Sequence, residues 1–387
     1  MRGYIGAIPK NFDTIPEGTL SLDDHFRWYG PKTGWDRIFQ EIASIPVVDT
    51  TETITTFGSG TVPSGTYKWW GGALASNDCI YGIPYVYSKI IKIDTSDDSI
   101  TLFDGGQDLS ASAKFSGGVT APNGCIYGIP STFNKILKID PSDDSVTLFD
   151  GGQNLSGTKK WSGGLLGPDD CIYGMPRDGT TVLKIDPSND SVTLMPILTA
   201  LYFAGTEKFM GCGLSKAGDI IGVNTNFQYT FFINNETGAN FFCNFDNANS
   251  YRFCGSVLAG NGDNYFIPYS ASGVGKLNTN TFKGSRINND LGDGSYKFCG
   301  GILAPNGKIY GIPHSLGYVL RIDPSDDTVD SVGTVYGGSS KYWGGVLAPN
   351  GSIYGIPASA TDILKISGIG TIGGGKKALL SPYVNKF

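Results

Sequence analysis

A short phrase, in which a basic residue is followed by an aromatic residue, any residue and glycine, occurs seven times along the chain of 387 residues. The copies begin at Lys68, Lys114, Lys160, Lys208, Arg252, Lys297 and Lys341. Their spacings are 46, 46, 48, 44, 45 and 44 residues, and a second phrase, usually Gly-Ile-Pro, begins 14 residues after each of them. A period in the mid-forties is typical of propeller blades. The repeat therefore predicts an all-β fold, a single seven-bladed β-propeller.

Each copy is predicted to form four strands. In the third copy the first strand is predicted at residues 160–166. In the second copy the second, third and fourth strands are predicted at residues 125–130, 136–140 and 145–149. The Asn123-Gly124 pair between the first and second strands favours a tight hairpin, because glycine accepts a positive φ. The proline of Gly-Ile-Pro lacks a backbone donor and is expected to end the second strand.

The two ends of the repeat predict how the ring closes. The seventh copy runs through its third strand at residues 363–366 and then continues into a glycine-rich segment. Residues 51–57, before the first copy, resemble a fourth strand, and Phe57 ends that segment as Phe103 and Phe149 end theirs. We expect residues 51–57 to pair as the outer strand of the last blade, which would leave no open edge in the ring.

The composition agrees with many short strands. Glycine supplies 56 residues, and charged residues make up only 17% of the chain. Glycine and aromatic residues are poor helix formers, and 40% hydrophobic residues can support a core. The net charge is −6, with no basic run, so we expect no binding to nucleic acid. No stretch of 18 apolar residues occurs, so we expect no membrane insertion.

The repeat divides the chain into a propeller at residues 49–367, an N-terminal arm at residues 1–48 and a C-terminal tail at residues 368–387. Within the arm, only residues 35–45 have an amphipathic helical pattern. Large apolar side chains would be costly on a free segment. We therefore predict that the arm docks on the ring or on a partner protein through Phe26, Trp28, Tyr29, Trp35 and Phe39. The apolar tail is expected to pack as well.

The basic and aromatic residues that begin the copies are the main candidate site, because the first strand of a blade lines the central channel. The basic residues could form a ring of positive charge that holds an anion or an acidic peptide, and the aromatic residues could stack on sugars. Alternatively, the repeat itself requires them, with each lysine bound locally to a carbonyl or an aspartate and each ring filling the wedge between blades. The candidates are Lys68, Trp69, Lys114, Phe115, Lys160, Trp161, Lys208, Phe209, Arg252, Phe253, Lys297, Phe298, Lys341 and Tyr342.

Other reactive residues give weaker signals. The Asp-Pro-Ser-Asp-Asp turns lack the ligand spacing of a calcium loop and are explained by turn geometry. Cys79, Cys125 and Cys171 occupy one repeat position, and Cys254 and Cys299 another. Equivalent positions in neighbouring blades are expected to be beyond disulfide reach, so buried free thiols are predicted. His25 and His314 belong to no recognisable motif. We expect no catalytic residue, metal or cofactor.

The repeat Lys-Trp-Ser-Gly-Gly, continued by Ile-Tyr-Gly-Ile-Pro and Ile-Asp-Pro, resembles propeller repeats of uncharacterised proteins and of tailed-bacteriophage virion proteins. The two termini also look like those of small phage structural proteins. This resemblance implies a non-enzymatic virion component associated with the tail, at its tip, nozzle or fibre, present in several copies and assembled in the host cytoplasm. Its partners would be other virion proteins, bound through the arm and the tail, and a glycan or receptor on the host surface. The alternatives are a carbohydrate-binding propeller that acts alone and a propeller hydrolase.

Overall fold

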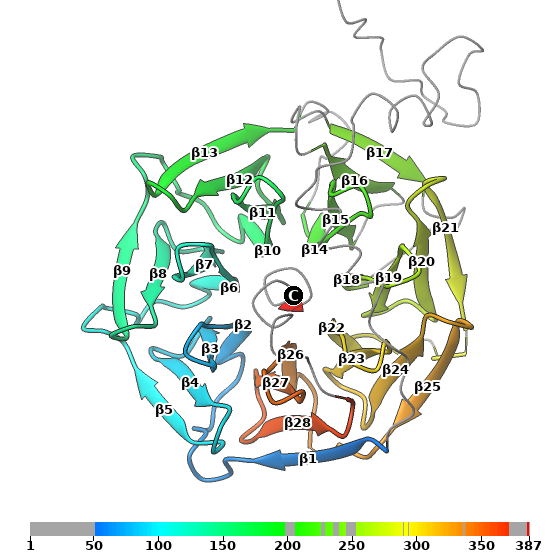
Figure 1. Cartoon of the computed structure of the whole chain (residues 1–387). Helices are drawn as coiled ribbons and strands as arrows, with labels where there is room; N and C mark the ends of the chain where they lie inside the picture. The colour runs from blue at the N-terminus through cyan, green and yellow to red at the C-terminus, as the bar shows by residue number, and fades with distance from the viewer. Residues whose placement is uncertain are drawn as a thin grey trace, which may run out of the picture.

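The computed structural model is a ring of seven β-sheets around a central axis (Figure 1). It describes residues 51–197, 206–225, 229–234, 240–244, 253–288, 290–292, 294–335, 337–370 and 385–386. Six sheets have four strands in the order of the chain from the axis outwards, and one of these six gains a fifth strand at its inner edge. In the seventh sheet the three inner strands come from the end of the propeller and the outermost strand comes from its beginning. The predicted all-β, seven-bladed propeller is confirmed. The arm residues Phe26, Trp28, Tyr29, Trp35 and Phe39 and the expected helix at 35–45 lie outside the described residues.

The strands follow the predicted pattern of each repeat closely. The first three blades contain β2 (Trp69–Leu74), β3 (Cys79–Pro84), β4 (Ile90–Asp94), β5 (Ile100–Phe103), β6 (Phe115–Thr120), β7 (Ile126–Pro130), β8 (Ile136–Asp140), β9 (Ser145–Phe149), β10 (Trp161–Leu166), β11 (Ile172–Pro176), β12 (Thr181–Asp186) and β13 (Ser191–Pro196). The next two contain β14 (Phe209–Leu214), β15 (Ile220–Asn224), β16 (Tyr229–Ile233), β17 (Asn240–Asn244), β18 (Phe253–Leu258), β19 (Asp263–Pro268), β20 (Val274–Asn278) and β21 (Lys283–Ile287). The last two contain β22 (Phe298–Leu303), β23 (Ile309–Pro313), β24 (Val319–Asp323), β25 (Thr328–Val332), β26 (Tyr342–Leu347), β27 (Ile353–Pro357) and β28 (Ile363–Ser367), together with β1 (Thr53–Phe57) and β29 (Asn385–Lys386).

Burial decreases from the axis to the rim of each blade. In the third blade every residue of β10 and β11 is buried, whereas β13 alternates between buried and exposed positions. This gradient explains why the inner strands are rich in Ile, Leu and aromatic residues on both faces, while the outer strands carry Ser and Thr towards solvent. The core therefore lies between neighbouring blades.

A glycine-dependent bulge shapes the first strand of every blade. The glycine that ends the basic phrase has a positive φ, as in Gly71 at 73° and Gly344 at 70°, and the register with the second strand shifts there. A β-bulge with a glycine at the left-handed position bends the strand. The repeated glycine is thus required by backbone conformation.

In most copies a second glycine follows directly, as in Gly71-Gly72 and Gly117-Gly118. This second glycine allows close contact with the neighbouring blade. A Cβ built on Gly118 would lie 2.6 Å from Cγ1 of Ile83 in the preceding blade, and one built on Gly72 would lie 2.9 Å from Cδ1 of Ile356. The isoleucine of Gly-Ile-Pro therefore packs onto bare backbone of the next blade. Full burial of one such side chain contributes about 2 kcal/mol, so the glycine pair and the isoleucine form one repeated packing unit.

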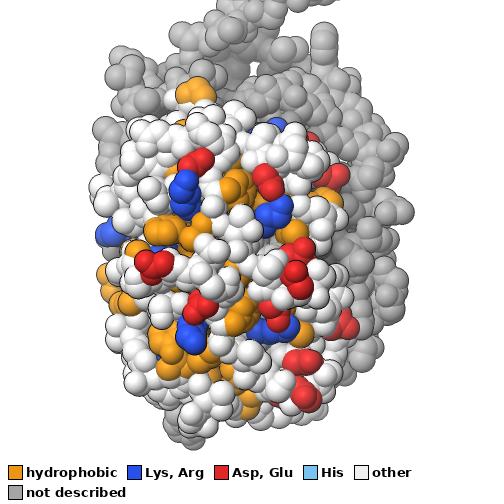
Figure 2. Space-filling model, turned by 90° about the vertical axis from the view of Figure 1, so that its left-hand side faces the viewer, with side chains coloured by type: hydrophobic (Ala, Val, Ile, Leu, Met, Phe, Trp, Pro, Cys, Tyr) orange, Lys and Arg blue, Asp and Glu red, His pale blue; other side chains and the backbone are white. Residues whose placement is uncertain are grey.

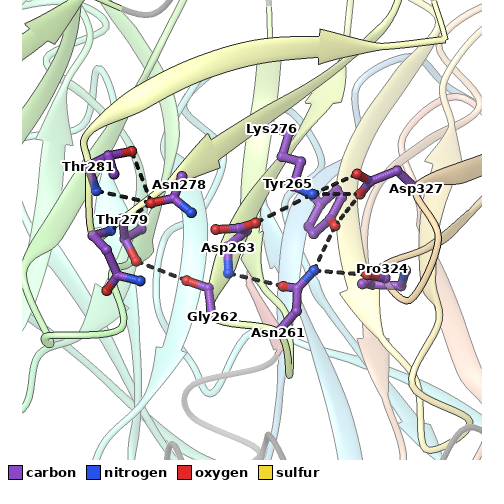
Figure 3. Close-up of polar contacts among 11 residues, drawn as sticks. Asn261, Gly262, Asp263, Tyr265, Lys276, Asn278, Thr279, Thr281, Pro324 and Asp327 are labelled. Carbon is purple, nitrogen blue, oxygen red and sulfur yellow. Dashed lines mark hydrogen bonds and ion pairs between the residues drawn. The ribbon is translucent and has the colours of Figure 1, made fainter.

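A polar network joins adjacent blades at the end of the ring opposite to the basic phrase. Figure 3 shows the copy in which Asn261 donates to the Tyr265 hydroxyl at 2.9 Å and to the Pro324 carbonyl at 2.9 Å. Tyr265 donates to Asp327 Oδ1 at 2.6 Å, and Lys276 pairs with Asp327 Oδ2 at 2.6 Å. Asp327 and Pro324 belong to the next blade, so the network holds two blades together.

The same network recurs with equivalent residues at other blade boundaries. The further copies are Asn77, Tyr81, Lys92 and Asp144, then Asn123, Tyr127, Lys138 and Asp190, and finally Asn350, Tyr354, Lys365 and Asp98. The repeated aspartates and lysines are therefore used to hold the ring together. Figure 2 shows basic and acidic side chains next to each other over one side of the ring, with apolar side chains between them.

The N-terminal strand closes the ring, as predicted. β1 pairs antiparallel with β28 over five residues, from Thr53 with Ser367 to Phe57 with Ile363. Glu52, next to β1, takes the place of the network aspartate for the sixth blade, because its Oε1 accepts from the Tyr310 hydroxyl and from Arg321 Nη1, each at 2.8 Å. The first and last parts of the propeller are thus joined by both a strand pair and an ion pair.

The last described residues of the chain return to the axis. β29 pairs with the inner edge of β22, where Lys386 lies opposite Gly301 and Asn385 opposite Ile302 (Figure 1). The tail was expected to pack, and these two residues do so within the ring. Residues 371–384 and 387 lie outside the described part, in which no helix is long and apolar enough to cross a membrane.

One prediction about cysteines is wrong. Cys254 and Cys299, in the first strands of neighbouring blades, form a disulfide with their Cα atoms 5.0 Å apart. The first strands converge at the axis, where a Cβ on Gly255 would lie 3.3 Å from the Cα of Gly300. Cys79 and Cys125, in contrast, are buried free thiols, as expected, and Cys171 is a half-buried one.

Candidate functional site

The repeated lysines are buried in the joints between blades, at the end of the ring where the first strands begin, hereafter the lysine end. Lys114 Nζ donates to the carbonyls of Ala111 at 2.6 Å, Tyr85 at 3.2 Å and Val86 at 3.3 Å. Lys68 Nζ likewise donates to the carbonyls of Gly65, Ala358 and Ala360, at 2.8–3.2 Å. Because Tyr85 and Ala358 belong to the preceding blade in each case, the ammonium group bridges two blades.

Burial has a direct electrostatic effect on these lysines. The side chains of Lys68, Lys114, Lys160, Lys208, Lys297 and Lys341 belong to residues that are at most 6% exposed. Burial lowers the pKa of Lys68, Lys114 and Lys160 to about 8. The predicted ring of exposed positive charge is therefore not what the structure presents, and local binding to carbonyls, the alternative, describes these residues. Arg252 lies outside the described residues.

The repeated aromatic residues fill the wedges between blades. Trp69, Phe115, Trp161, Phe209, Phe253, Phe298 and Tyr342 are at most 2% exposed. Trp69 Nε1 donates to the Lys89 carbonyl at 2.7 Å, and Trp161 Nε1 donates to the Thr181 carbonyl at 2.6 Å. Since their faces are covered and these two indoles have partners, the repeated aromatics are not placed to stack on a ligand.

The residue that precedes each repeated lysine has an unusual backbone. All six described copies have positive φ although none is glycine: Tyr67, Ala113, Lys159, Glu207, Tyr296 and Ser340, with φ from 47° to 64°. Such conformations cost free energy in a residue with a side chain and are found preferentially at functional sites. Two of these side chains are among the large exposed apolar ones, Tyr67 at 40% and Tyr296 at 48%.

A cluster of six residues lies across the axis at the lysine end and is called the axial cluster here. Its members come from the residue after the repeated aromatic and from the residue after Gly-Ile-Pro, and they are Trp70, Tyr85, Arg177, Tyr269, His314 and Trp343. The ring centroids of Trp70 and Trp343 are 3.5 Å apart, and His314 lies 5.1 Å from Trp343. On the other side Trp70 contacts Tyr85 at 4.3 Å, and Arg177 Cζ lies 5.8 Å from its ring. Planar groups from five blades are thereby stacked across the centre.

Backbone hydrogen bonds fix the axial residues that follow Gly-Ile-Pro. The His314 N–H donates to the Lys297 carbonyl at 2.9 Å, and the His314 carbonyl accepts from the Lys341 N–H at 2.7 Å. Arg177 is held in the same way between the Lys160 carbonyl and the Lys208 N–H, at 2.8 and 2.9 Å. Each of these residues is therefore anchored to two blades, which preorganises the side chains that project from them.

His314 is a neutral histidine with a defined tautomer. Its Nδ1 lies 3.2 Å from the Tyr296 carbonyl and 3.1 Å from Ser315 Oγ. A carbonyl oxygen only accepts, so Nδ1 carries the proton and donates, which leaves Nε2 as an acceptor. Burial lowers the pKa of His314 to about 4. The residue is 2% exposed, and Nε2 has no hydrogen-bond partner among the described residues.

Arg177 balances its charge within the site. Its Nη2 pairs with Glu207 Oε1 at 2.9 Å, with the arginine side chain 8% exposed and the glutamate 40% exposed. The left-handed Glu207 is itself held by a bond of 2.7 Å from its N–H to Asp178 Oδ1. Burial raises the pKa of Tyr85, and the nearby Arg177 opposes this shift. The arrangement gives a positive and a negative group next to aromatic surfaces, which suits recognition of a polar ligand with apolar faces.

The described residues contain no candidate metal-binding site. No group of three His, Cys, Asp or Glu side chains there is arranged to hold a metal ion. The turn aspartates bind their own loops, as in Asp140, whose Oδ1 accepts from the Ser142 N–H at 2.9 Å and from its hydroxyl at 2.7 Å. They behave as the turn geometry predicts.

The residues that repeat do not indicate the axial cluster. The cluster occupies two positions at which the copies differ: Trp70, Ser116, Ser162, Met210, Cys254, Cys299 and Trp343 at one, and Tyr85, Ser131, Arg177, Thr225, Tyr269, His314 and Ala358 at the other. Both positions adjoin strongly repeated residues. Variation at fixed positions beside the axis was the signal that would have found the site.

Comparisons with known proteins identify the fold. No family model matches the chain, and no curated protein sequence matches it. Among solved structures, a streptogramin B lyase matches with a TM-score of 0.66 at 15% identity, over 82% of this chain and 97% of that one. A catalytically inactive histidine-to-alanine variant of virginiamycin B lyase from Staphylococcus aureus with quinupristin also gives 0.66, at 12% identity, over 82% and 99%. Hydrazine synthase from Kuenenia stuttgartiensis gives 0.58 at 12% identity, over 80% and 98%. These likenesses show the propeller fold.

Proposed function

We propose that the protein is a non-enzymatic attachment module that binds a surface glycan at the lysine end of the ring. The observation that carries the proposal is the exposure of Tyr67 and Tyr296 on left-handed backbone at the lysine end, where the ring of Tyr296 lies 5.0 Å from Tyr269 and 6.2 Å from His314 of the axial cluster. Tyrosine offers a flat apolar face and a polar tip at little cost in conformational entropy, which suits contacts with sugars. The carbonyl of Tyr296 also orients His314.

The rigid ring supports this role. The repeated lysines, aspartates and tyrosines form hydrogen bonds that join neighbouring blades. The side chains at the variable axial positions are therefore free to differ from blade to blade. An attachment module needs a stiff frame and a face with its own pattern of side chains. The structure has both at one end of the ring.

We propose a bacteriophage virion, and its tail in particular, as the setting of this module. The support is the resemblance of the repeat and of the termini to tailed-phage structural proteins. In this setting the arm at residues 1–48 and the C-terminal tail would hold the ring to other virion proteins. Peptides of this chain should be found by mass spectrometry in purified virions, and cryo-electron microscopy should place seven-bladed rings on the tail. Their absence from virions of a phage that encodes the chain would refute this setting.

The glycan-binding role is tested separately with purified protein on a glycan array. Binding to a defined set of glycans, lost in the double variant Tyr67→Ala and Tyr296→Ala, would support it. No binding to any glycan on the array would refute it, whatever the virion experiment shows.

One observation favours an enzyme as the second candidate. His314 places an unprotonated Nε2 beside the axis, and the matched solved structures include lyases, one of them an inactive histidine variant. A hydrolase or lyase of this kind would lose turnover in His314→Ala while keeping ligand affinity. A binding protein would instead lose affinity and show no turnover before the substitution.

A further inference from the structure

The C-terminal strand β29 lies in the central channel and is held there by strand pairing. It pairs with β22 at Gly301 and Ile302 on the inner edge of that strand, and it also contacts the first strands β14, β18 and β26. Strand addition of this kind uses backbone hydrogen bonds, so it depends little on side chains. The pairing covers two residue positions, whereas β1 pairs with β28 over five. The inner edge of β22 is therefore a surface that accepts a strand and holds it by a short contact.

The strand enters the channel from the end opposite to the lysine end, hereafter the network end. β22 runs from Lys297 at the lysine end towards the turn at Asn306, the network asparagine of its blade. β29 is antiparallel to β22, so it runs from the network end towards the lysine end. The last blade also ends at the network end, where the Ile369 carbonyl accepts a hydrogen bond of 3.0 Å from the Asn306 N–H. The chain thus leaves the blades and enters the channel through the same end of the ring.

The connection between these two points is longer than a path within one ring requires. The five residues from Gly301 to Asn306 span at most about 17 Å. Residues 371–384, which connect the last blade to β29, are 14 in number and can span about 46 Å when extended. The C-terminal strand can therefore reach its own channel, or the channel of a second ring whose network end faces its own.

We infer that two copies of the protein exchange their C-terminal strands, so that each β29 adds to the inner edge of β22 in the other ring. Because the chain leaves the blades and enters the channel at the network end, the two rings face each other with their network ends. Such an interface uses the same surface on both copies and closes after two. The lysine ends, with Tyr67 and Tyr296, point away from each other. This inference goes beyond the proposed glycan binding and does not depend on it.

The charge of the network end indicates that the exchanged strands, and not the rims of the rings, hold the two copies together. The turns that supply the network aspartates also carry the exposed Asp97, Asp143 and Asp326. Two such acidic rims repel each other when they face. A connection of 14 residues lets the strands exchange without close contact of the rims, and salt screens the repulsion. The dimer should therefore become stronger as the ionic strength rises.

Analytical ultracentrifugation of the full-length protein, over a range of protein concentrations and at two ionic strengths, measures the exchange. The double variant Asn385→Pro with Lys386→Pro removes the backbone N–H of both residues of β29, whereas Asn385→Ala with Lys386→Ala keeps both and is the matched control. The parent protein and the alanine variant should form dimers with similar dissociation constants. The proline variant should dimerise about tenfold more weakly, which corresponds to about 1.4 kcal/mol. An equal Tm for all three proteins shows that the ring itself is unchanged.

A labelled peptide of residues 381–387 tests the accepting edge separately, by fluorescence anisotropy. It should bind the proline variant, whose own strand no longer pairs, and it should bind the parent protein more weakly. The same peptide with proline in place of Asn385 and Lys386 should not bind, because it lacks the backbone donors.

Three outcomes would overturn the inference. A parent protein that stays monomeric while the peptide binds the proline variant would show that β29 pairs only within its own ring. A dimer that the proline variant forms equally well, or that weakens as the ionic strength rises, would place the interface on the rims. A dimer that depends on β29, combined with no binding of the peptide, would exclude the edge of β22 as the acceptor. None of these measurements involves a sugar, so their results are independent of the test of glycan binding.

Discussion

Replacing Glu52 with alanine tests how the ring is closed. Glu52 Oε1 accepts hydrogen bonds from the Tyr310 hydroxyl and from Arg321 Nη1, each at 2.8 Å, and its side chain is 12% exposed. Burial by itself raises the pKa of Glu52, but the hydrogen bonds from Arg321 and Tyr310 outweigh it, so that the pKa lies below its ordinary value of 4.5. The folded ring therefore binds the charged form of Glu52 preferentially.

The magnitude follows from the two lost bonds. Both bonds end on the charged carboxylate of Glu52, and a hydrogen bond to a charged group contributes about 1.5–3 kcal/mol. Arg321 is 24% exposed and retains Asp330 at 2.8 Å, so solvent and the second acid reduce the loss. We expect Glu52→Ala to lower the free energy of unfolding by about 2 kcal/mol. For a chain of this size that corresponds to roughly 2–3 °C in Tm.

Urea unfolding followed by circular dichroism measures the effect, with Asp330→Ala as the matched control. Asp330 binds the same arginine but is 53% exposed, and its removal should cost less than about 0.5 kcal/mol. Because the pKa of Glu52 is lowered in the folded state, its contribution is present above the unfolded pKa and is lost as the pH falls through the folded pKa. The difference between the parent protein and Glu52→Ala should therefore shrink below pH 4.5. Equal stabilities of Glu52→Ala and Asp330→Ala at pH 7 would refute this account of closure.

Three further predictions concern packing, the bridging lysines and the axial histidine. Gly118→Ala should cost about 1–3 kcal/mol, because its Cβ would lie 2.6 Å from Ile83; a thermal melt indistinguishable from that of the parent would contradict this. Lys114→Met should cost about 2 kcal/mol by leaving carbonyls without their donor, whereas the exposed Lys159→Met should change stability little, and chemical denaturation compares them. Burial of His314 lowers its pKa to about 4 from 6.5, so the unfolded chain binds more protons between these values and stability falls as the pH drops from 6.5 to 4. The loss should reach about 3 kcal/mol at pH 4 relative to His314→Phe, and parallel stability curves for the two proteins would exclude it.

The repeat was sufficient to predict the ring because fold information in a propeller is periodic. A motif that recurs seven times makes the same contacts with neighbouring residues in each copy. Gly-Ile-Pro and the repeated lysine 14 residues before it therefore predicted the extent of each blade and its strands. The pairing of β1 with β28 followed from a missing fourth strand in the last copy. The role of Glu52 could not be predicted, since it replaces an aspartate from a different segment and depends on where β1 places it.

The site could not be predicted from the same information. Charge and repetition make Lys114 a candidate for binding, yet its ammonium group donates to three carbonyls inside a joint between blades. Trp70 shares its residue type with only one other copy, at Trp343, and His314 occurs once at its position. Neither belongs to a motif, and only the convergence of first strands at the axis brings them within one stack. That convergence also brings Cys254 and Cys299 close enough to form a disulfide, although equivalent positions of neighbouring blades were expected to be too far apart for one.

The central claim, that the lysine end of the ring binds a glycan through its axial face, is tested most directly by localising that binding. Affinity for the best glycan of the array is measured for the parent protein, for Tyr67→Ala combined with Tyr296→Ala, and for Tyr81→Phe combined with Tyr127→Phe. The first pair lies at the lysine end, and the second forms part of the network at the opposite end. The account predicts that the first double variant loses binding and keeps its Tm, and that the second loses stability and keeps its affinity. Retained affinity in the first double variant, or loss confined to the second, would contradict it.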